Sequence, residues 1–390
     1  MTAQRSAPQV WSDDERVAVA VLAGLSNMTT ARLRWLLGGR APTDALDVAS
    51  GSTPDGGPID RVRHRFPEVA AAWSNELTAG ASEEMAAALD RVGVRVIGPA
   101  DADWPEPLRV DHDPPAVLFT IGSIAPDRRR VAVIGTRNPT EAGKQTAARL
   151  GYELSEAGVS VVSGLALGID GAAHRGALAS GDVWPIGVVA NGLDRPYPAR
   201  HAALWSQVAR RGSLLSEWPP GTKPDAFRFP QRNRIIAALA EIVVVVESRE
   251  KGGSLVTARE AADRGVEVMA VPGSPGVRSS AGTNELVHDG AGIVLSTADV
   301  LDVLGLDHSR TGRLVDTRPP PSERAGSLLP LLAERPATVE VLLDRSGRSL
   351  AELAVDLARL ERDGWVHESD GWFQALDSWA RVANDDGGVR

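Results

Sequence analysis

The segment 131–170 constrains the fold of this chain most strongly, because it holds two successive units of strand, loop and helix. The first predicted strand, 131–135, is wholly apolar and leads into a Gly-Thr-Arg sequence. The second, 159–163, leads into the glycine-rich loop SGLALGID. Strands that alternate with helices predict a doubly wound parallel sheet. The loops after such strands meet at one edge, where backbone N–H groups and helix N-termini attract anions, phosphates above all.

The composition is that of an ordinary soluble protein, with 43% hydrophobic and 24% charged residues. A length of 390 residues suggests two or three domains. No stretch approaches the roughly 18 apolar residues of a membrane span, and the N-terminus lacks the apolar region of a signal peptide. There is no cysteine, which excludes disulfides and thiolate chemistry. We therefore expect a cytoplasmic protein that does not interact with a membrane.

The formal net charge of −9 argues against non-specific binding of nucleic acid, but binding depends on local patches rather than on the total. The segment 222–234 is such a patch, because it contains one acidic residue and the basic residues Lys223, Arg228, Arg232 and Arg234. This segment is therefore a candidate for contact with a polyanion.

Predicted strands alternate with helices from residue 131 to about residue 304. They lie at 131–135, 159–163, 183–190, 212–215, 242–247, 266–271 and 291–295. Two earlier apolar runs, 95–98 and 116–122, are expected to extend the same sheet. We assign residues 81–305 to an extended Rossmann-like domain of the α/β class.

Smaller domains are predicted on both sides of this one. Residues 1–80 show the apolar spacing of short helices and are assigned to an N-terminal helical domain, either a plain helical cap or a SAM/helix-hairpin-helix-like module. Residues 306–326 are polar and proline-rich, as expected of a linker. Residues 327–378 combine three predicted helices with an Asp-Gly hairpin signal, which is the pattern of a winged-helix-like domain, and 379–390 form a tail.

The loops after the first two strands carry candidate phosphate-binding groups. In Gly135-Thr136-Arg137 the glycine permits close approach, and the arginine can bind a phosphate or stack on a base. The second loop and its helix contribute Ser163, Gly164, Leu165, Ala166, Gly168, Asp170 and His174. A structural role stays open for Asp170 as a helix cap and for His174 as a packed residue. Because the loop has neither GxGxxG spacing nor a Walker lysine, we expect phosphate binding without nucleotide hydrolysis.

The basic segment supplies a further set of candidates. Arg232, Asn233 and Arg234 stand at the start of a predicted helix, where three long polar groups suit a row of phosphates. Phe227 lies between basic residues, and this mixture is typical of a surface that binds single strands, unless the phenylalanines belong to the core. Lys223 precedes this group. The loop after 242–247 repeats the pattern of glycine and hydroxyls before a helix with Gly253, Ser254 and Thr257.

Motifs of catalysis are missing from the sequence. It contains no HExxH, no cysteine–histidine zinc pattern, no GxSxG and no evident acidic pair for metal-assisted hydrolysis. We therefore expect a binding protein rather than an enzyme, and we predict no cofactor and no metal.

The chain resembles the bacterial DNA-processing protein A family (DprA, also called Smf). The matching motifs occur in the family's order: VAVIGTR, SGLALGIDGAAH, GLDRPYP, LLSEWPPGTKP, FPQRNRIIAALA, GGSLVTAREAADRG, AVPGS and SAGTNELVHDGA. They cover most of 95–304, and the family's three-domain architecture agrees with the domains assigned above. One departure is His201, where the family's YPxxN pattern leads us to expect asparagine.

The resemblance implies a function. Members of the family bind and protect single-stranded DNA and load the RecA recombinase onto it during natural transformation. They form homodimers through the Rossmann-like domain. Carried over to this sequence, the family's DNA pocket implies contacts from Arg137, from the loop 163–170 and from the lysine before FPxRN, which is Lys223 here.

Two other functions stay open. LOG-type phosphoribohydrolases have a related fold, but their PGGxGTxxE motif is matched neither at 272–275 nor at 282–285. A transcription regulator would use the winged helix to read DNA and the Rossmann-like domain to sense a nucleotide. The acidic balance of 350–363 opposes this, because an acidic recognition helix suits phosphate-lined DNA poorly.

Overall fold

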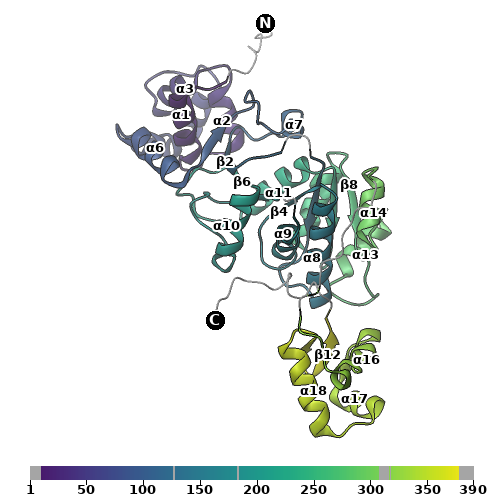
Figure 1. Cartoon of the computed structure of the whole chain (residues 1–390). Coiled ribbons are helices and arrows are strands. Elements are labelled where there is room, and N and C mark those ends of the chain that lie inside the picture. Colours follow the sequence, from purple (N-terminus) through teal and green to yellow (C-terminus); the bar gives the residue numbers. More distant parts are fainter. Residues whose placement is uncertain (1–9, 126–127, 182–183, 307–315, 317, 377–390) are drawn as a thin grey trace.

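The computed structural model describes residues 10–125, 128–181, 184–306, 316 and 318–376. Three parts follow one another along the chain: N-terminal helices, a central part with a large sheet, and a small C-terminal part (Figure 1). The predicted tail, 379–390, and most of the predicted linker, 307–315 and 317, lie outside the described residues. Within the described residues, no helix is long and apolar enough to cross a membrane.

The central part is built on a nine-stranded sheet with the order β1-β2-β6-β5-β4-β3-β7-β8-β9. The strands are β1 (Arg95–Ile97), β2 (Leu118–Gly122), β3 (Arg130–Ile134), β4 (Ser160–Ser163), β5 (Ile186–Val188), β6 (Ser213–Ser216), β7 (Ile242–Val245), β8 (Glu267–Ala270) and β9 (Gly292–Ile293). All pairings among β3 to β9 are parallel, whereas β2 runs antiparallel to both β6 and β1. The predicted parallel core and its extension by two earlier strands are therefore confirmed.

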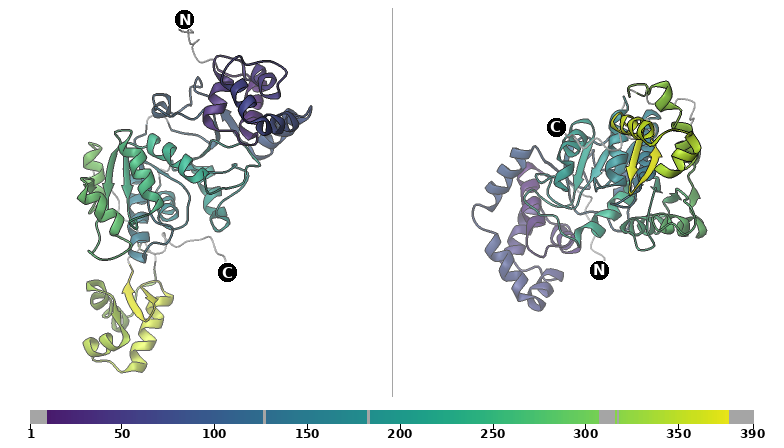
Figure 2. Two further views of the ribbon diagram at one scale, coloured as in Figure 1. Left: turned by 180° about the vertical axis from the view of Figure 1, so that it is seen from behind. Right: turned by 90° about the horizontal axis from the view of Figure 1, so that it is seen from below.

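Helices cover both faces of this sheet (Figure 2). They are α7 (Glu106–Arg109), α8 (Glu141–Glu156), α9 (Ile169–Ala179), α10 (Ala202–Arg211), α11 (Arg228–Leu239), α12 (Gly253–Ala262), α13 (Ala281–His288) and α14 (Thr297–Val303), with a 3-10 turn at Ala199–His201. In β3, Val131 and Val133 pack with α8, α9 and α14, while Ala132 and Ile134 pack with α11 and α12. Burial on both faces explains why the strands of the core read as continuous apolar runs.

The N-terminal part is helical, as predicted. Its helices are α1 (Asp13–Gly24), α2 (Thr30–Leu37), α3 (Pro42–Ser50), α4 (Pro58–Arg65), α5 (Pro67–Glu76) and α6 (Ala81–Val92). Leu22 and Trp73 share one hydrophobic cluster with Phe119 of β2 and Leu214 of β6, so these helices pack directly on the end of the sheet. Because α6 packs on α1, the helical part continues past residue 80, where the sequence analysis ended it.

The C-terminal part contains helices and a small sheet. The helices are α15 (Glu323–Gly326), α16 (Leu329–Glu334), α17 (Val339–Ser346) and α18 (Leu350–Arg362), and the strands are β10 (Ala337–Thr338), β11 (Val366–Ser369) and β12 (Trp372–Ala375). The strand order is β10-β12-β11. Asp370 and Gly371, with φ of 52° and 82°, form the tight turn of the predicted hairpin. The winged-helix-like assignment itself stays a prediction.

Residues 318–326, which the sequence analysis placed in the linker, are packed into the C-terminal part. Arg318 donates hydrogen bonds to the carbonyls of Gly364 (2.8 Å) and Leu376 (2.9 Å). Its guanidinium carbon lies 3.7 Å from the ring centroid of Trp365. Although residues 318–326 have the composition of a linker, they form the beginning of the C-terminal part.

Candidate nucleic-acid interface

The loops after β3, β4, β5 and β7 meet at the carboxyl edge of the parallel sheet, as the sequence predicts. Thr136, after β3, donates its N–H to the carbonyl of Glu247, after β7, at 2.8 Å. Arg232 of α11 donates to the carbonyl of Gly164, after β4, and to that of Val188, in β5. These bonds connect the ends of the strands in two pairs, β3 with β7 and β4 with β5, which lie side by side in the sheet.

The loop after β4 comes very close to the loop after β3. Leu165 and Gly168 adopt left-handed backbone, with φ of 54° and 82°. A Cβ atom on Gly168 would lie 2.4 Å from the carbonyl oxygen of Thr136, far inside van der Waals contact. Only glycine permits this approach, so Gly168 lets the two loops pack against each other, and its contact with a ligand stays a prediction.

Two residues of this loop face the interior. The Ser163 hydroxyl donates to the carbonyl of Val133 at 2.7 Å, and Leu165 is fully buried. Their predicted contact with a ligand is not supported by this arrangement, because neither side chain reaches the surface. Ala166 is half-buried, and its carbonyl accepts a hydrogen bond from Gly171 at 3.1 Å.

Asp170 lies beneath the loop and is neither a phosphate ligand nor the cap of the next helix. The N-cap of α9 is Gly168, and Asp170 stands in the first turn. Its buried carboxylate accepts a hydrogen bond from the N–H of Gly164 at 3.0 Å. Burial raises the pKa of Asp170, while the neighbouring charge of Arg232 acts to lower it. Asp170 therefore holds the loop in shape from inside.

His174 is fully buried in α9, which corrects its assignment as a phosphate contact. Burial lowers the pKa of the imidazole to about 3, so the ring is neutral at physiological pH. A neutral ring without access to solvent cannot bind a phosphate, and the alternative of a packed helix residue is the one observed.

Arg232 is also an interior residue, contrary to the prediction that it binds phosphate. A Cβ on Gly164 would lie 2.3 Å from Arg232 Nη1, so the guanidinium occupies the space that the glycine leaves open. Burial lowers the pKa of Arg232 to about 10, which leaves it charged at neutral pH. Asn233 is half-buried, and its Oδ1 accepts from Arg232 Nε at 3.2 Å. This part of α11 supports the loops from below.

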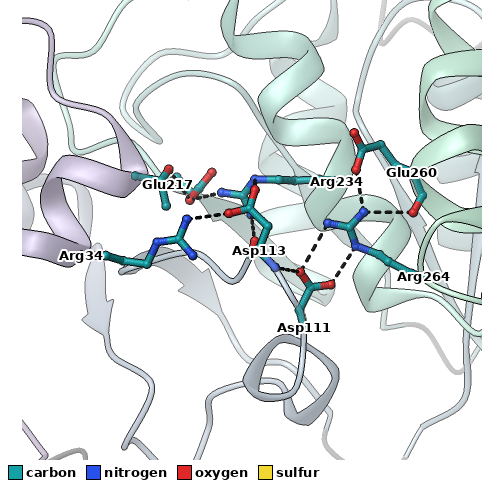
Figure 3. A network of polar contacts seen from close by, with 8 residues as sticks. Arg34, Asp111, Asp113, Glu217, Arg234, Glu260 and Arg264 are labelled. Atoms are coloured by element: carbon teal, nitrogen blue, oxygen red, sulfur yellow. Dashed lines mark hydrogen bonds and ion pairs between the residues drawn. The ribbon is translucent and has the colours of Figure 1, made fainter. Parts of the chain in front are cut away.

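Arg234 belongs to an internal ion-pair network rather than to a phosphate-binding row (Figure 3). Its guanidinium lies 2.5 Å from the buried carboxylate of Glu217 and 3.3 Å from that of Asp113. Asp113 also pairs with Arg34 of α2 at 2.6 Å. Burial raises the pKa of Glu217, and Arg234 acts against this by favouring the ionised form. The network therefore joins the N-terminal helices to α11 and β6.

The residues of the edge that do reach solvent are basic and aromatic. Arg137 is exposed, and its guanidinium carbon lies 4.9 Å from the ring centroid of Phe229. The Phe229 ring lies 5.8 Å from that of Tyr197. Phe227 is 55% exposed, with the guanidinium of Arg228 at 4.9 Å from its centroid. Phe227 is therefore not a core residue.

We call this surface the strand-end surface. It consists of Gly135–Arg137, Ala166–Gly168, Tyr197, and Lys223–Phe229. Lys223 is exposed, as its predicted role requires. Tyr197 was missed as a site residue, although its place in the GLDRPYP motif was the signal that could have identified it. The arrangement offers rings for stacking and cations for phosphates side by side.

The loop after β7 contributes less than predicted. Gly253 is exposed at the start of α12, but Ser254 and Thr257 are buried. The Ser254 hydroxyl donates to Ser248 Oγ at 2.9 Å, and Gly282 donates its N–H to the Ser248 carbonyl at 2.8 Å. The hydroxyls thus fix the loop to the start of α13 and are not free to bind a ligand.

The departure at His201 has a structural explanation. The ring is buried, with Nδ1 lying 3.0 Å from the carbonyl oxygen of Leu165 and Nε2 lying 3.2 Å from Arg175. A Cβ on Gly171 would come within 2.4 Å of this ring. His201 therefore supports the loop after β4 from the side, and it does not lie on the strand-end surface.

The fold and this surface together define a Rossmann-like α/β protein whose exposed edge suits a chain of phosphates and flat rings. A family model described as DNA recombination-mediator protein A matches residues 95–305. The chain belongs to this family.

Two similar proteins and one solved structure support this membership. The chain is 42% identical to the DNA processing protein DprA of Bacillus subtilis (strain 168) over 221 residues, which cover 56% of this chain and 74% of that protein. It is 36% identical to the protein Smf of Escherichia coli (strain K12) over 277 residues, 69% of this chain and 74% of that protein. The X-ray structure of DNA processing protein A from Streptococcus pneumoniae superposes with a TM-score of 0.61 at 31% identity, covering 75% of this chain and 98% of that chain.

Proposed function

We propose that this protein binds single-stranded DNA at the strand-end surface and acts by binding rather than by catalysis. The observation that carries the proposal is the position of Arg137. Its exposed guanidinium stands at the end of β3, between a glycine-rich loop and the ring of Phe229. A phosphate at Arg137 leaves the adjoining base within reach of Phe229 and Tyr197.

Family membership supports a proposal for a wider role. We propose that the protein protects incoming single strands and loads a RecA-type recombinase onto them during DNA uptake, as a cytoplasmic homodimer that associates through the central part. The Bacillus subtilis relative is described as a DNA processing protein, and the matching family model as a recombination mediator. A mediator needs a surface that holds a strand without cutting it, which agrees with an edge of arginine, lysine and aromatic rings.

Titration of labelled poly-dT and of a duplex of equal length, at about 50 and about 200 mM salt, tests the proposal. We expect tighter binding to the single strand, little dependence on base sequence, and affinity that falls steeply with salt because bound phosphates release counterions. Equal or tighter binding to the duplex would overturn the proposal.

A further inference from the structure

We infer that the N-terminal helices hold a second site for single-stranded nucleic acid, formed by a pocket between α2 and α4 that accepts an unpaired base and its phosphates. The pocket has a volume of about 1100 Å³. The side chains that matter for its chemistry are Arg32, Trp35, Arg61, His64, Arg65 and Phe66. None of them belongs to the strand-end surface. The inference rests on the proposed function for the identity of the occupant.

Two aromatic rings of the pocket are open to solvent. Trp35 is 46% exposed and Phe66 is 37% exposed, although Trp73 of the same helical part is completely buried. A single exposed ring would need no explanation, but two rings that line one pocket form the kind of apolar patch that marks a binding site. Every base has a flat face that stacks on such rings, and this interaction does not depend on sequence.

The charge of the pocket favours an anionic occupant. The guanidinium carbons of Arg32 and Arg65 lie 5.7 and 5.6 Å from the ring centroid of Phe66, and Arg61 is exposed on α4. The single acidic residue of the lining, Asp60, accepts backbone N–H bonds from Asp55 and Gly56. The Asp60 carboxylate is therefore directed at the backbone of the loop. The three arginines of the lining outnumber this one acidic residue, so the pocket is positive although the whole chain has a net charge of −9. A purely apolar peptide would leave these arginines unused.

The pocket also has a fixed position relative to the strand-end surface. Thr30 of α2 lies 3.3 Å from the Glu217 carboxylate, and Arg34 pairs with Asp113 at 2.6 Å. The segment that begins at Glu217 leads along the chain to Lys223. The same short helix thus contacts this segment with one side and carries Trp35 of the pocket. We therefore assign one continuous strand as the occupant of both sites.

The experiment uses the full chain and oligo-dT of about 6 and about 30 nucleotides, so that the shorter oligomer covers one site and the longer can cover both. Trp35→Ala removes a stacking ring, and Arg65→Glu reverses a charge. The matched controls are Trp372→Ala and Arg91→Glu, which alter exposed residues outside both sites. We expect both pocket variants to lose about tenfold affinity for the long oligomer and to bind the short one normally. The two control variants should bind both oligomers with the affinity of the wild type.

A second measurement locates the strand directly. Photocross-linking of a long oligomer that contains 5-iododeoxyuridine should label peptides that contain Trp35 or Phe66 as well as peptides of the strand-end surface. Pocket variants that bind both oligomers like the wild type, or the absence of cross-links at the pocket, would overturn the inference. It is also overturned if the variants change only the oligomeric state, because the pocket is then a contact between copies of this chain.

Failure of the inference can be told apart from failure of the proposed function. If the wild type binds the short oligomer and Arg137→Ala does not, the strand-end surface holds DNA whatever the pocket variants do. If the wild type binds neither oligomer, both proposals are wrong.

Discussion

Arg137 and Arg232 have the same predicted role but opposite environments. Arg137 stands at a strand end and is exposed, with an aromatic ring beside it. Arg232 stands at the start of a helix, is buried, and donates to backbone carbonyls at the ends of β4 and β5. A basic residue near a binding loop therefore has two competing partners, the ligand and the carbonyl groups of the protein. Where strand ends leave backbone carbonyls without a donor, the guanidinium binds these carbonyls and is not available to a ligand.

The largest effect is expected from Arg232→Ala, which tests the interior side of the comparison. The change removes the charge opposite Asp170 and the donor of two carbonyls. Two buried carbonyls then lose their charged donor and a buried carboxylate loses a nearby positive charge, which should lower the free energy of unfolding by about 3–5 kcal/mol. Urea unfolding followed by circular dichroism measures it. An Arg232→Ala protein with wild-type stability but without DNA binding would place Arg232 on the binding surface instead.

Arg137→Ala tests the exposed side. Loss of a charge-assisted contact to a phosphate should weaken binding of single strands by about 1.5–3 kcal/mol, or about 10- to 100-fold. Stability should stay within about 0.5 kcal/mol of the wild type, because the residue is exposed at a strand end. Fluorescence anisotropy with labelled poly-dT measures the affinity, with Arg210→Ala as the control on another exposed arginine. Normal binding, or an unfolded variant, would show that the role of Arg137 is misassigned.

The buried ring of His174 makes the free energy of unfolding depend on pH. In the folded protein the pKa is lowered to about 3, and in the unfolded chain it returns to about 6.5. Between these values the unfolded state binds one more proton, so the free energy of unfolding falls as the pH falls. His174→Gln should reduce the stability lost between about pH 7 and about pH 5 by about 2 kcal/mol. His112→Gln, at an exposed residue, should keep the full loss. Equal losses in wild type and His174→Gln would mean that the ring is protonated in the folded state.

The smallest effect is expected from removal of the C-terminal part. All residues of the strand-end surface precede residue 306, so a 1–306 fragment should bind poly-dT within a few-fold of the full chain. A cut near Pro320 is unsuitable, since Arg318 is bonded within the C-terminal part. Gel-shift assays on both proteins, with circular dichroism to show that the fragment is folded, make the comparison. A loss of about tenfold or more (roughly 1.4 kcal/mol) in a folded fragment would assign a DNA contact to the C-terminal part.

The sequence was sufficient to predict the sheet because burial on both faces leaves an unmistakable pattern. The apolar run at 242–247 encloses β7, and the run at 131–135 matches β3 to within one residue at each end. The meeting of strand ends at one edge then follows from the parallel topology, and with it the exposure of Arg137.

The interior role of Arg232 was missed, although the sequence held a signal. Ile235, Ile236 and Leu239 follow at three, four and seven positions, so Arg232 continues the buried stripe of α11. No such signal exists for His201, whose contact with Leu165 joins distant segments. The packing of Arg318 on Trp365 was likewise invisible, because it depends on tertiary contact within a segment of linker-like composition.

The bridge that Arg232 makes between two strand ends also limits how this part of the protein can change in evolution. The Arg232 side chain donates hydrogen bonds to the Gly164 and Val188 carbonyls at the same time, so both must keep their positions relative to α11. A change of length that moves the end of β4 or of β5 breaks one of these bonds and leaves a buried carbonyl without its donor, so the connections next to Gly164 and Val188 should vary little in length. The stretch 221–227 is tied to the interior at its first two residues, where Gly221 donates to the Asp194 carboxylate and buried Gly192 donates to the Thr222 carbonyl. Among the described contacts, residues 223–227 form hydrogen bonds only with Arg228 of the same segment. Variation in length should therefore accumulate there, around Lys223, while the two bridged loops keep their size.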